Sequence, residues 1–423
     1  MTAKRRTRRF ALPLFIPRPT RRGWAILGLA VVLYLFANQT QVSWLYVFAA
    51  LGVGVWLATA GLPRRMLAAL TATRRLDEAG GGADRERHVG DPLAVTLTLH
   101  NAGNLPAAQL RGEEVCPAAP PAEQAQPFFL SVPARGQAEL RYTTVCARRG
   151  WFEFPPLPVS TRAPFGFFAA RRQLSAPAGV LVFPAYRELP RFPLLDRRPS
   201  VQNPLATVGL GSEFVGVREY RPGDSPRHVH WRSTARAGRL IVKEFAEETQ
   251  PGLTIALDVR AASALGPTGA DSLELAIQVA ATLVHYAERR ALAVTLVSNS
   301  RAWPAPPGPL GRWAAMNYLA RLPADGERPL ADVLQRAAPA VFVAALLPSP
   351  DEAAGAALIE LKQQGPEVLA VLIDPAPFAP DLVGQAAALA GALRASGVAV
   401  RVLGGLPDWE RDLVSDDRAA ARW

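Results

Sequence analysis

The 423 residues are nearly three times the usual length of one domain, so two or three domains are expected. Hydrophobic residues make up 49% of the chain and charged residues 20%, a composition that excludes a largely disordered protein. The net charge of +11 suggests nucleic-acid binding, but residues 1–76 hold twelve Lys and Arg and no acidic residue. The rest of the chain therefore carries +11 − 12 = −1, and no nucleic-acid partner is expected for it.

Residues 23–63 contain no charged side chain. A single helix of this length would be about twice as long as the 30 Å hydrocarbon core of a membrane. The segment is therefore predicted to fold back as a two-helix transmembrane hairpin, with spans at 23–37 and 42–60 and a turn at the polar residues 38–41. Trp24 and Trp44 are the expected interfacial anchors. A cleaved secretory signal and a buried soluble hairpin are the alternatives.

Basic residues lie on both sides of this hairpin. Residues 1–22 form a basic tail, and Arg64, Arg65, Arg74 and Arg75 follow the second span. Positive charge favours the cytoplasmic side, so a multi-pass protein of the cell membrane with both termini in the cytoplasm is predicted. In that compartment Cys116 and Cys146 are expected to be reduced thiols.

The middle of the chain has the alternation typical of strands, clearest at residues 93–100, with further candidates at 138–146, 151–154 and 180–183. This pattern predicts an Ig-like β-sandwich over residues 77–183. Residues 184–210 are rich in Pro and Arg and are predicted to be a linker packed along the surface.

From residue 251 to 405 the pattern changes to apolar strands that alternate with helices. Strands are expected at 253–259, 292–298, 340–347, 368–374 and 398–403, with helices at 271–290, 351–364 and 384–395. This order predicts an α/β, Rossmann-like domain with a mostly parallel sheet, followed by a C-terminal tail at 406–423. Ligands in such folds bind at the carboxyl ends of strands, which directs attention to Asp258, to residues 298–300 and to Asp374.

Residues 211–250 carry the most distinctive pattern in the chain. It consists of Gly211, Phe214, Gly216, Arg218, Tyr220, Gly223, Asp224, Arg227, Trp231, Ala235, Arg236, Leu240, Lys243 and Glu247. This spacing resembles the signature of the domain-of-unknown-function 58 (DUF58) family. The segment Ala163-Pro164-Phe165-Gly166 is similar to the family's Asp-Pro-Phe-Gly element, with Ala163 in place of the Asp.

The resemblance implies an N-terminal hairpin, a β-rich middle domain and a von Willebrand factor A-like C-terminal domain. It also implies association with a MoxR-type AAA+ ATPase in envelope or complex assembly.

Within the signature, Pro222, Gly223 and Asp224 predict a turn flanked by Arg218 and Arg227. One interpretation is an Arg and Asp network that fixes a loop. The other is a binding surface for an acidic partner.

The resemblance also suggests where to look for a metal. Von Willebrand A domains use Asp-x-Ser-x-Ser after the first strand, but here Asp258 is followed by Arg260 and Ala262. These replacements argue against a metal and suggest that Asp258 either caps the strand end or pairs with Arg260. Only Ser263 and Asp374 remain as distant oxygen donors.

A second candidate metal site is the pair His228 and His230, which would share one face of a strand, although no third ligand is near in sequence. The glycines at 209 and 211 lack the residues of a nucleotide-binding loop. No cofactor is predicted.

The preferred hypothesis is a membrane-anchored, non-enzymatic scaffold or adaptor that binds protein partners. The first alternative is a hydrolase or phosphate-handling enzyme that uses Asp258, Asp374 and the signature arginines. The second is nucleic-acid binding by residues 187–243, which hold eleven basic and five acidic residues.

Overall fold

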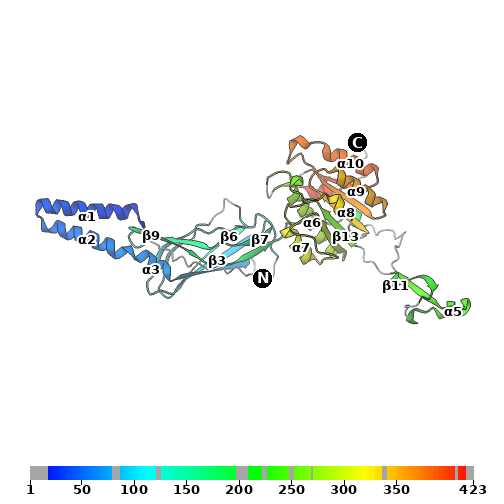
Figure 1. Ribbon diagram of the computed structural model, residues 1–423, viewed down its shortest axis with the longest axis horizontal. Helices are drawn as coiled ribbons and strands as arrows, with labels where there is room; N and C mark the ends of the chain where they lie inside the picture. The colour runs from blue at the N-terminus through cyan, green and yellow to red at the C-terminus, as the bar shows by residue number, and fades with distance from the viewer. Residues whose placement is uncertain are drawn as a thin grey trace, which may run out of the picture. The chain divides into compact units, whose positions relative to one another are not determined.

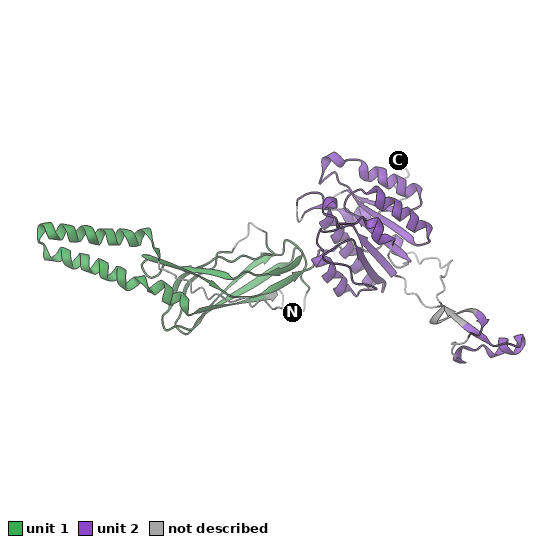
Figure 2. Ribbon diagram, viewed as in Figure 1, with its two compact units in different colours: residues 1–183 green, residues 184–423 purple. Residues whose placement is uncertain are grey.

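The computed structural model describes residues 18–78, 86–120, 125–196, 208–221, 226–246, 252–267, 270–335, 341–404 and 408–415. The chain divides into two compact units, Met1–Phe183 and Pro184–Trp423 (Figure 2).

Two long apolar helices begin the first unit: α1 (Arg21–Thr40) and α2 (Ser43–Ala60), which pack against each other as a hairpin (Figure 1). Both are long and apolar enough to cross a membrane. Large side chains such as Val32, Phe36 and Leu57 are about 60% exposed, so most of the apolar surface is not covered by the residues that the structure describes. Such a surface is stable in lipid rather than in water.

The first helix is longer than the span predicted at residues 23–37. Asn38 and Gln39 continue the helix, and the Thr40 hydroxyl donates to the Phe36 carbonyl at 2.8 Å. The helix ends where Gln41 adopts φ 56° and its N–H donates to the Ala37 carbonyl at 2.8 Å. Polar residues do not by themselves break a helix, because an αL residue that satisfies the last carbonyls provides the stop.

The β-rich part of the first unit contains two main sheets. A three-stranded antiparallel sheet has the order β2-β3-β6, a five-stranded sheet has the order β1-β9-β8-β4-β5, and β7 pairs with β10. The bounds are β1 Arg18–Pro19, β2 Leu70–Glu78, β3 Pro92–Asn101, β4 Ala107–Gly112, β5 Phe128–Val132, β6 Gln137–Val145, β7 Gly150–Glu153, β8 Leu157–Thr161, β9 Phe168–Leu174 and β10 Gly179–Val182. Leu97, Leu110 and Leu157 of the shared core are at most 1% exposed.

Strand β2 begins at Leu70, before the domain boundary expected at residue 77. The short helix α3 (Leu62–Ala68) separates it from α2. Arg172 of β9 donates from one guanidinium nitrogen to the carbonyls of Leu67 and Ala68, at 2.6 and 2.7 Å. The end of the helical hairpin is therefore built into the β region without an intervening linker.

A buried ion pair lies in the core of this unit. Arg74 on β2 binds Glu114 through two parallel N–H···O bonds, each 2.9 Å long, and both side chains are at most 1% exposed. The Tyr142 hydroxyl also donates to Glu114 at 3.1 Å, and burial raises the pKa of this tyrosine. Arg74 is therefore not one of the free flanking charges that the sequence suggested.

Removing one partner of this pair is expected to destabilise the β region. Glu114→Gln leaves a buried guanidinium uncompensated and should cost about 3 kcal/mol, whereas Glu113→Gln, which breaks an exposed pair with Arg171, should cost under about 1 kcal/mol. Hydrogen exchange of the β3 amides in the detergent-solubilised chain measures both. Equal protection in the two variants would contradict a structural role for the buried pair.

The second unit contains a five-stranded, wholly parallel sheet with helices around it, in the order β14-β13-β15-β16-β17 (Figure 1). The strands are β13 Gly252–Leu257, β14 Ala293–Ser298, β15 Phe342–Leu347, β16 Glu367–Ile373 and β17 Ala399–Leu403. The helices are α6 Ser272–Arg289, α7 Arg312–Arg321, α8 Leu330–Leu334, α9 Glu352–Gln363 and α10 Gln385–Ala395. The parallel sheet predicted from the apolar runs is confirmed, because strands covered on both faces contain few polar residues.

Two segments predicted to lie outside this domain are part of its packing. In the expected linker, Leu189 and Phe192 are at most 3% exposed, and the Phe192 N–H donates to the Tyr286 hydroxyl at 3.0 Å, just before α4 (Pro193–Asp196). In the expected C-terminal tail, α11 (Trp409–Val414) contacts β17 and buries Trp409 completely. A few apolar side chains without periodicity were enough to dock each segment.

Candidate functional site

The signature segment forms a β-hairpin with a helical insertion. Strands β11 (Val208–Glu219) and β12 (Ile241–Ala246) are antiparallel, with Arg218 opposite Val242 and Val217 opposite Lys243. Gly211, Phe214 and Gly216 lie on β11, and Tyr220 follows it. Gly223, Asp224 and Glu247 lie outside the described residues, as does the whole turn predicted at residues 222–224.

Helix α5 (Trp231–Ala237) lies between the two strands, and local hydrogen bonds define its ends. His230 is the N-cap, since its Nδ1 accepts from the Ser233 N–H at 3.2 Å. Gly238 ends the helix at φ 67°, and its N–H donates to the Thr234 carbonyl at 3.0 Å. Residues 226–228 form a 3-10 turn, so the prediction that His228 and His230 share one face of a strand is wrong.

The exposed surface of this hairpin is basic and aromatic. Trp231 is 69% exposed. The exposed basic side chains are Arg227, Arg232, Arg236, Arg239 and Lys243. Arg239 pairs with Glu219, and both side chains are more than half exposed. Exposed Trp and Arg side chains are the residue types enriched in protein-binding hot spots.

The second candidate site is the carboxyl edge of the parallel sheet, where Asp258 follows β13. Its side chain is fully buried. Its two oxygens accept from the Ser263 hydroxyl and from the Asn299 amide, each at 2.7 Å. Asn299 in turn accepts from the Val259 N–H at 2.7 Å, which ties the end of β13 to the end of β14.

Arg260 completes this cluster. Its Nη2 donates to Asp258 Oδ2 at 2.8 Å and also to Asp351 Oδ2, and its Nε lies 3.1 Å from both oxygens of Asp258. Asp351 follows β15 and caps α9 through the N–H groups of Ala353 and Ala354. The guanidinium thus bridges the ends of β13 and β15, where connections leave in opposite directions and where doubly wound sheets ordinarily bind their ligands.

Charge balance at this cluster favours an ionised Asp258. Burial by itself raises the pKa of this carboxyl, but hydrogen bonds from Arg260, Ser263 and Asn299 outweigh burial and lower the pKa overall. The hydrogen bond between Arg260 and Asp258 raises the pKa of the Arg260 guanidinium. A permanent cation therefore neutralises the carboxylate.

The residues at this edge do not fit a divalent metal. Arg260, Ser263 and Asn299 all donate hydrogen bonds to the oxygens of Asp258. These bonds engage the oxygens that a metal ion would need as ligands. Asp374 accepts from the Ala376 N–H instead of joining the cluster. In the described part of the chain, no three His, Cys, Asp or Glu side chains are grouped for a metal.

Sequence reasoning identified Asp258, Arg260 and Ser263 but missed the role of Asp351. Its position before an apolar helical run signals an N-cap, yet no local pattern indicates that its second oxygen reaches a residue ninety-one positions away. Asn299 lay within the strand end that the sequence singled out. Its role as a bridge depends on β14 pairing with β13.

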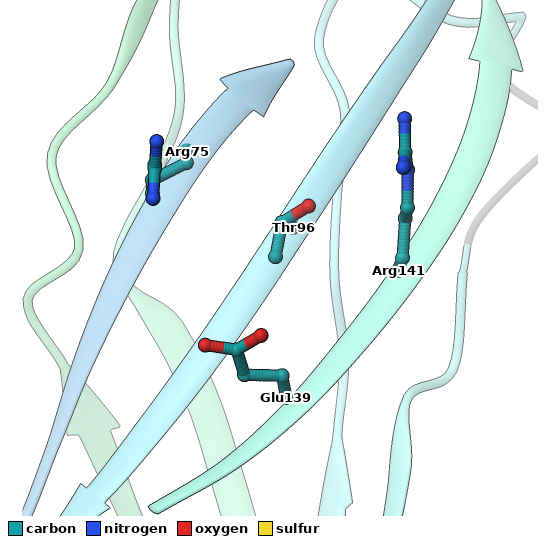
Figure 3. A pocket seen from close by; sticks show the side chains of 4 residues that line it. All are labelled: Arg75, Thr96, Glu139 and Arg141. Atoms are coloured by element: carbon teal, nitrogen blue, oxygen red, sulfur yellow. The ribbon is translucent and has the colours of Figure 1, made fainter.

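A polar cleft of about 390 Å³ lies on the three-stranded sheet of the first unit (Figure 3). Arg75, Thr96 and Arg141 are direct cross-strand neighbours on β2, β3 and β6, and Glu139 lies two residues before Arg141 on β6. The cleft is lined by the acidic Glu139 as well as by the basic Arg75 and Arg141, so it does not strongly favour a ligand of either charge. It has the character of a solvated sheet face.

Comparison with known proteins gives a family match over one region. The family described as "Protein of unknown function DUF58" matches residues 216–359, from the middle of β11 into α9. The "Uncharacterized protein YeaD" of Bacillus subtilis (strain 168) is 23% identical over 281 residues, which span 62% of this chain and 65% of that protein. The chain therefore contains a DUF58 region and has a distant, uncharacterised relative.

Solved structures add no functional information. The CARDB domain of PF1109 from Pyrococcus furiosus covers 26% of this chain and 94% of that domain, at 9% identity and a TM-score of 0.17. A GH20 exo-β-N-acetylglucosaminidase from Vibrio harveyi covers 79% of this chain and 81% of the enzyme, at 8% identity and a TM-score of 0.21. Neither score indicates a shared fold.

The Asp258 cluster is expected to stabilise the sheet. Asp258→Asn should lower the free energy of unfolding of the α/β unit by about 2 kcal/mol, because the charge-assisted hydrogen bonds to Asp258 are lost while Arg260 keeps Asp351 as a partner. Calorimetry of the full chain in detergent measures this, with Asp374→Asn as the control outside the cluster. Added Mg²⁺ should not change the melting temperature of Asp258→Asn or of Asp374→Asn.

The same variant predicts a pH dependence. The folded pKa of Asp258 lies below the unfolded value of about 3.9, so its contribution is present above that pH and is lost as pH falls through the folded pKa. The difference in melting temperature between the native chain and Asp258→Asn should therefore shrink below about pH 4. A difference that grew in acid would contradict an ionised Asp258.

Proposed function

We propose that the chain is a membrane-anchored, non-enzymatic scaffold whose signature hairpin binds a protein partner. The observation that carries this proposal is the Asp258 cluster, because the edge where an α/β sheet ordinarily binds ligand is filled by an internal ion-pair network. A carboxylate already neutralised by Arg260 is a poor general base and a poor metal ligand. In this proposal the β region is an Ig-like sandwich and the α/β unit is von Willebrand factor A-like.

The anchor in this proposal is the pair α1 and α2, with both chain ends in the cytoplasm. The support is the uncovered apolar surface of both helices together with the basic residues on their flanks.

This orientation can be measured in intact cells or spheroplasts. A thiol reagent that does not cross the membrane should leave a cysteine at Thr2 unlabelled and should label a cysteine at Gln41, in the turn between the helices. The native Cys116 and Cys146 are buried and give the background. The reverse labelling pattern would contradict cytoplasmic termini.

The partner-binding surface in this proposal is the basic and aromatic face around α5. Trp231 and Arg236 are exposed on a seven-residue helix that is too short to be stable alone. An acidic surface on the partner complements the surrounding guanidinium groups. The family resemblance suggests a MoxR-type AAA+ ATPase for this role.

Co-purification from detergent extracts tests this surface. Trp231→Ala together with Arg236→Ala should reduce recovery of the partner at least tenfold, because aromatic and Arg hot spots each contribute about 2 kcal/mol or more. Trp313→Ala is the matched control, since Trp313 on α7 is 60% exposed but lies outside the hairpin.

Equal recovery from both variants would remove the support for the hairpin. Salt-sensitive DNA binding by the chain, abolished by the same double variant, would favour the nucleic-acid alternative instead.

A further inference from the structure

The loop of residues 162–167, between β8 and β9, exposes an aromatic side chain that none of the contacts above explains. Ala163 at its base is buried, whereas Phe165 at its tip is 58% exposed. Its only described ring contact is with Phe167, at 5.7 Å between centroids. Arg162 beside it is also exposed. This is the Ala-Pro-Phe-Gly element singled out in the sequence.

Backbone contacts hold this loop against the start of α1. Thr20, the N-cap of α1, donates its N–H to the Phe167 carbonyl at 2.8 Å and its hydroxyl to the Gly166 carbonyl at 2.5 Å. A Cβ on Gly23 would lie 2.2 Å from the Phe167 carbonyl oxygen, so a glycine is required for the two backbones to touch. The loop therefore has a defined level along the helix axis.

A second contact fixes the same level on α2. The ring of Phe168, the first residue of β9, lies 4.9 Å from the ring of Trp56, which is one turn before the end of α2. Both helices thus meet the loop side of the β region at their near ends.

The length of α1 places this level at the membrane boundary. The 20 residues of α1 (Arg21–Thr40) give a rise of about 30 Å, which matches the thickness of a hydrocarbon core. With the polar C-terminal end of α1 in the far interface, the near boundary falls at or beyond Arg21 and Arg22. Arginine side chains at this depth reach outward to the headgroups.

We propose that Phe165 inserts into this near interface and acts as a third membrane contact, in addition to the two helices. This inference rests on the proposed membrane anchoring. An aromatic ring is favoured at the boundary of the hydrocarbon, and Arg162 and Arg22 suit anionic headgroups. With Trp24, which is 60% exposed, Phe165 supplies apolar surface at the level of the first turn of α1. The loop would also hold the β region at a defined depth and tilt.

Nitroxide depth measurements test this inference in the full chain, reconstituted in vesicles of phosphatidylethanolamine and phosphatidylglycerol. Phe165→Cys carries the label at the loop tip. Val31→Cys, in the middle of α1 and 50% exposed, reports on the anchor itself. Val145→Cys is the matched control on the β region, because this valine is 42% exposed and lies eight residues along β6 from the strand end nearest α3, or roughly 27 Å.

The expected result is faster collision with oxygen than with a water-soluble nickel chelate at positions 165 and 31, and the reverse at 145. If the label at position 31 collides faster with oxygen but the label at position 165 collides faster with the nickel chelate, the loop contact is overturned and the anchor stays in place. Nickel-dominated collisions at 31 would overturn the anchor and the loop contact together. Oxygen-dominated collisions at all three positions would also overturn it, because the β region would then be immersed without selectivity for the loop.

Discussion

The uncovered apolar surface of the helical hairpin is the constraint on which the first unit depends. A helix satisfies its own backbone hydrogen bonds, so α1 and α2 need no protein around them in lipid. Their ends do need partners, and the β region supplies these. Thr20 binds the loop before β9, and Arg172 binds the carbonyls at the end of α3. The β region is therefore attached to the helical hairpin by several short contacts.

Each unit also contains an arginine that is matched to a buried carboxylate. Arg74 pairs with Glu114 in the β region, and Arg260 pairs with Asp258 in the α/β unit. A buried charge is costly without its partner. Arg74 and Glu114 join segments forty positions apart, and Arg260 connects Asp258 to Asp351, which lies ninety-one positions after Arg260 in the chain. At the sheet edge the guanidinium of Arg260 lies between two carboxylates, Asp258 after β13 and Asp351 after β15, and pairs with both.

Periodicity predicted the large features well and the small ones poorly. The parallel sheet was predictable because buried strands are continuous apolar runs, and the hairpin because residues 23–63 carry no charge. Strand β2 was missed since it combines Leu70 and Ala72 with the buried Arg74, which interrupts the apolar signal. The docking of Phe192 and Trp409 was missed because single apolar residues in Pro-rich or polar segments have no period. His230 was assigned to a strand because its capping role depends on the turn before it.

The sequence by itself determined where the chain is apolar, where its positive charge lies, and which segment resembles DUF58. It did so because composition and short spacing are local properties. Only the tertiary structure decided that Asp258 shares Arg260 with Asp351, that Glu114 is buried against Arg74, and that Phe165 lies beside the start of α1. These contacts join residues between two and about 150 positions apart. They depend on which strands become neighbours, and that choice minimises buried unpaired charge and exposed apolar surface over the whole chain at once.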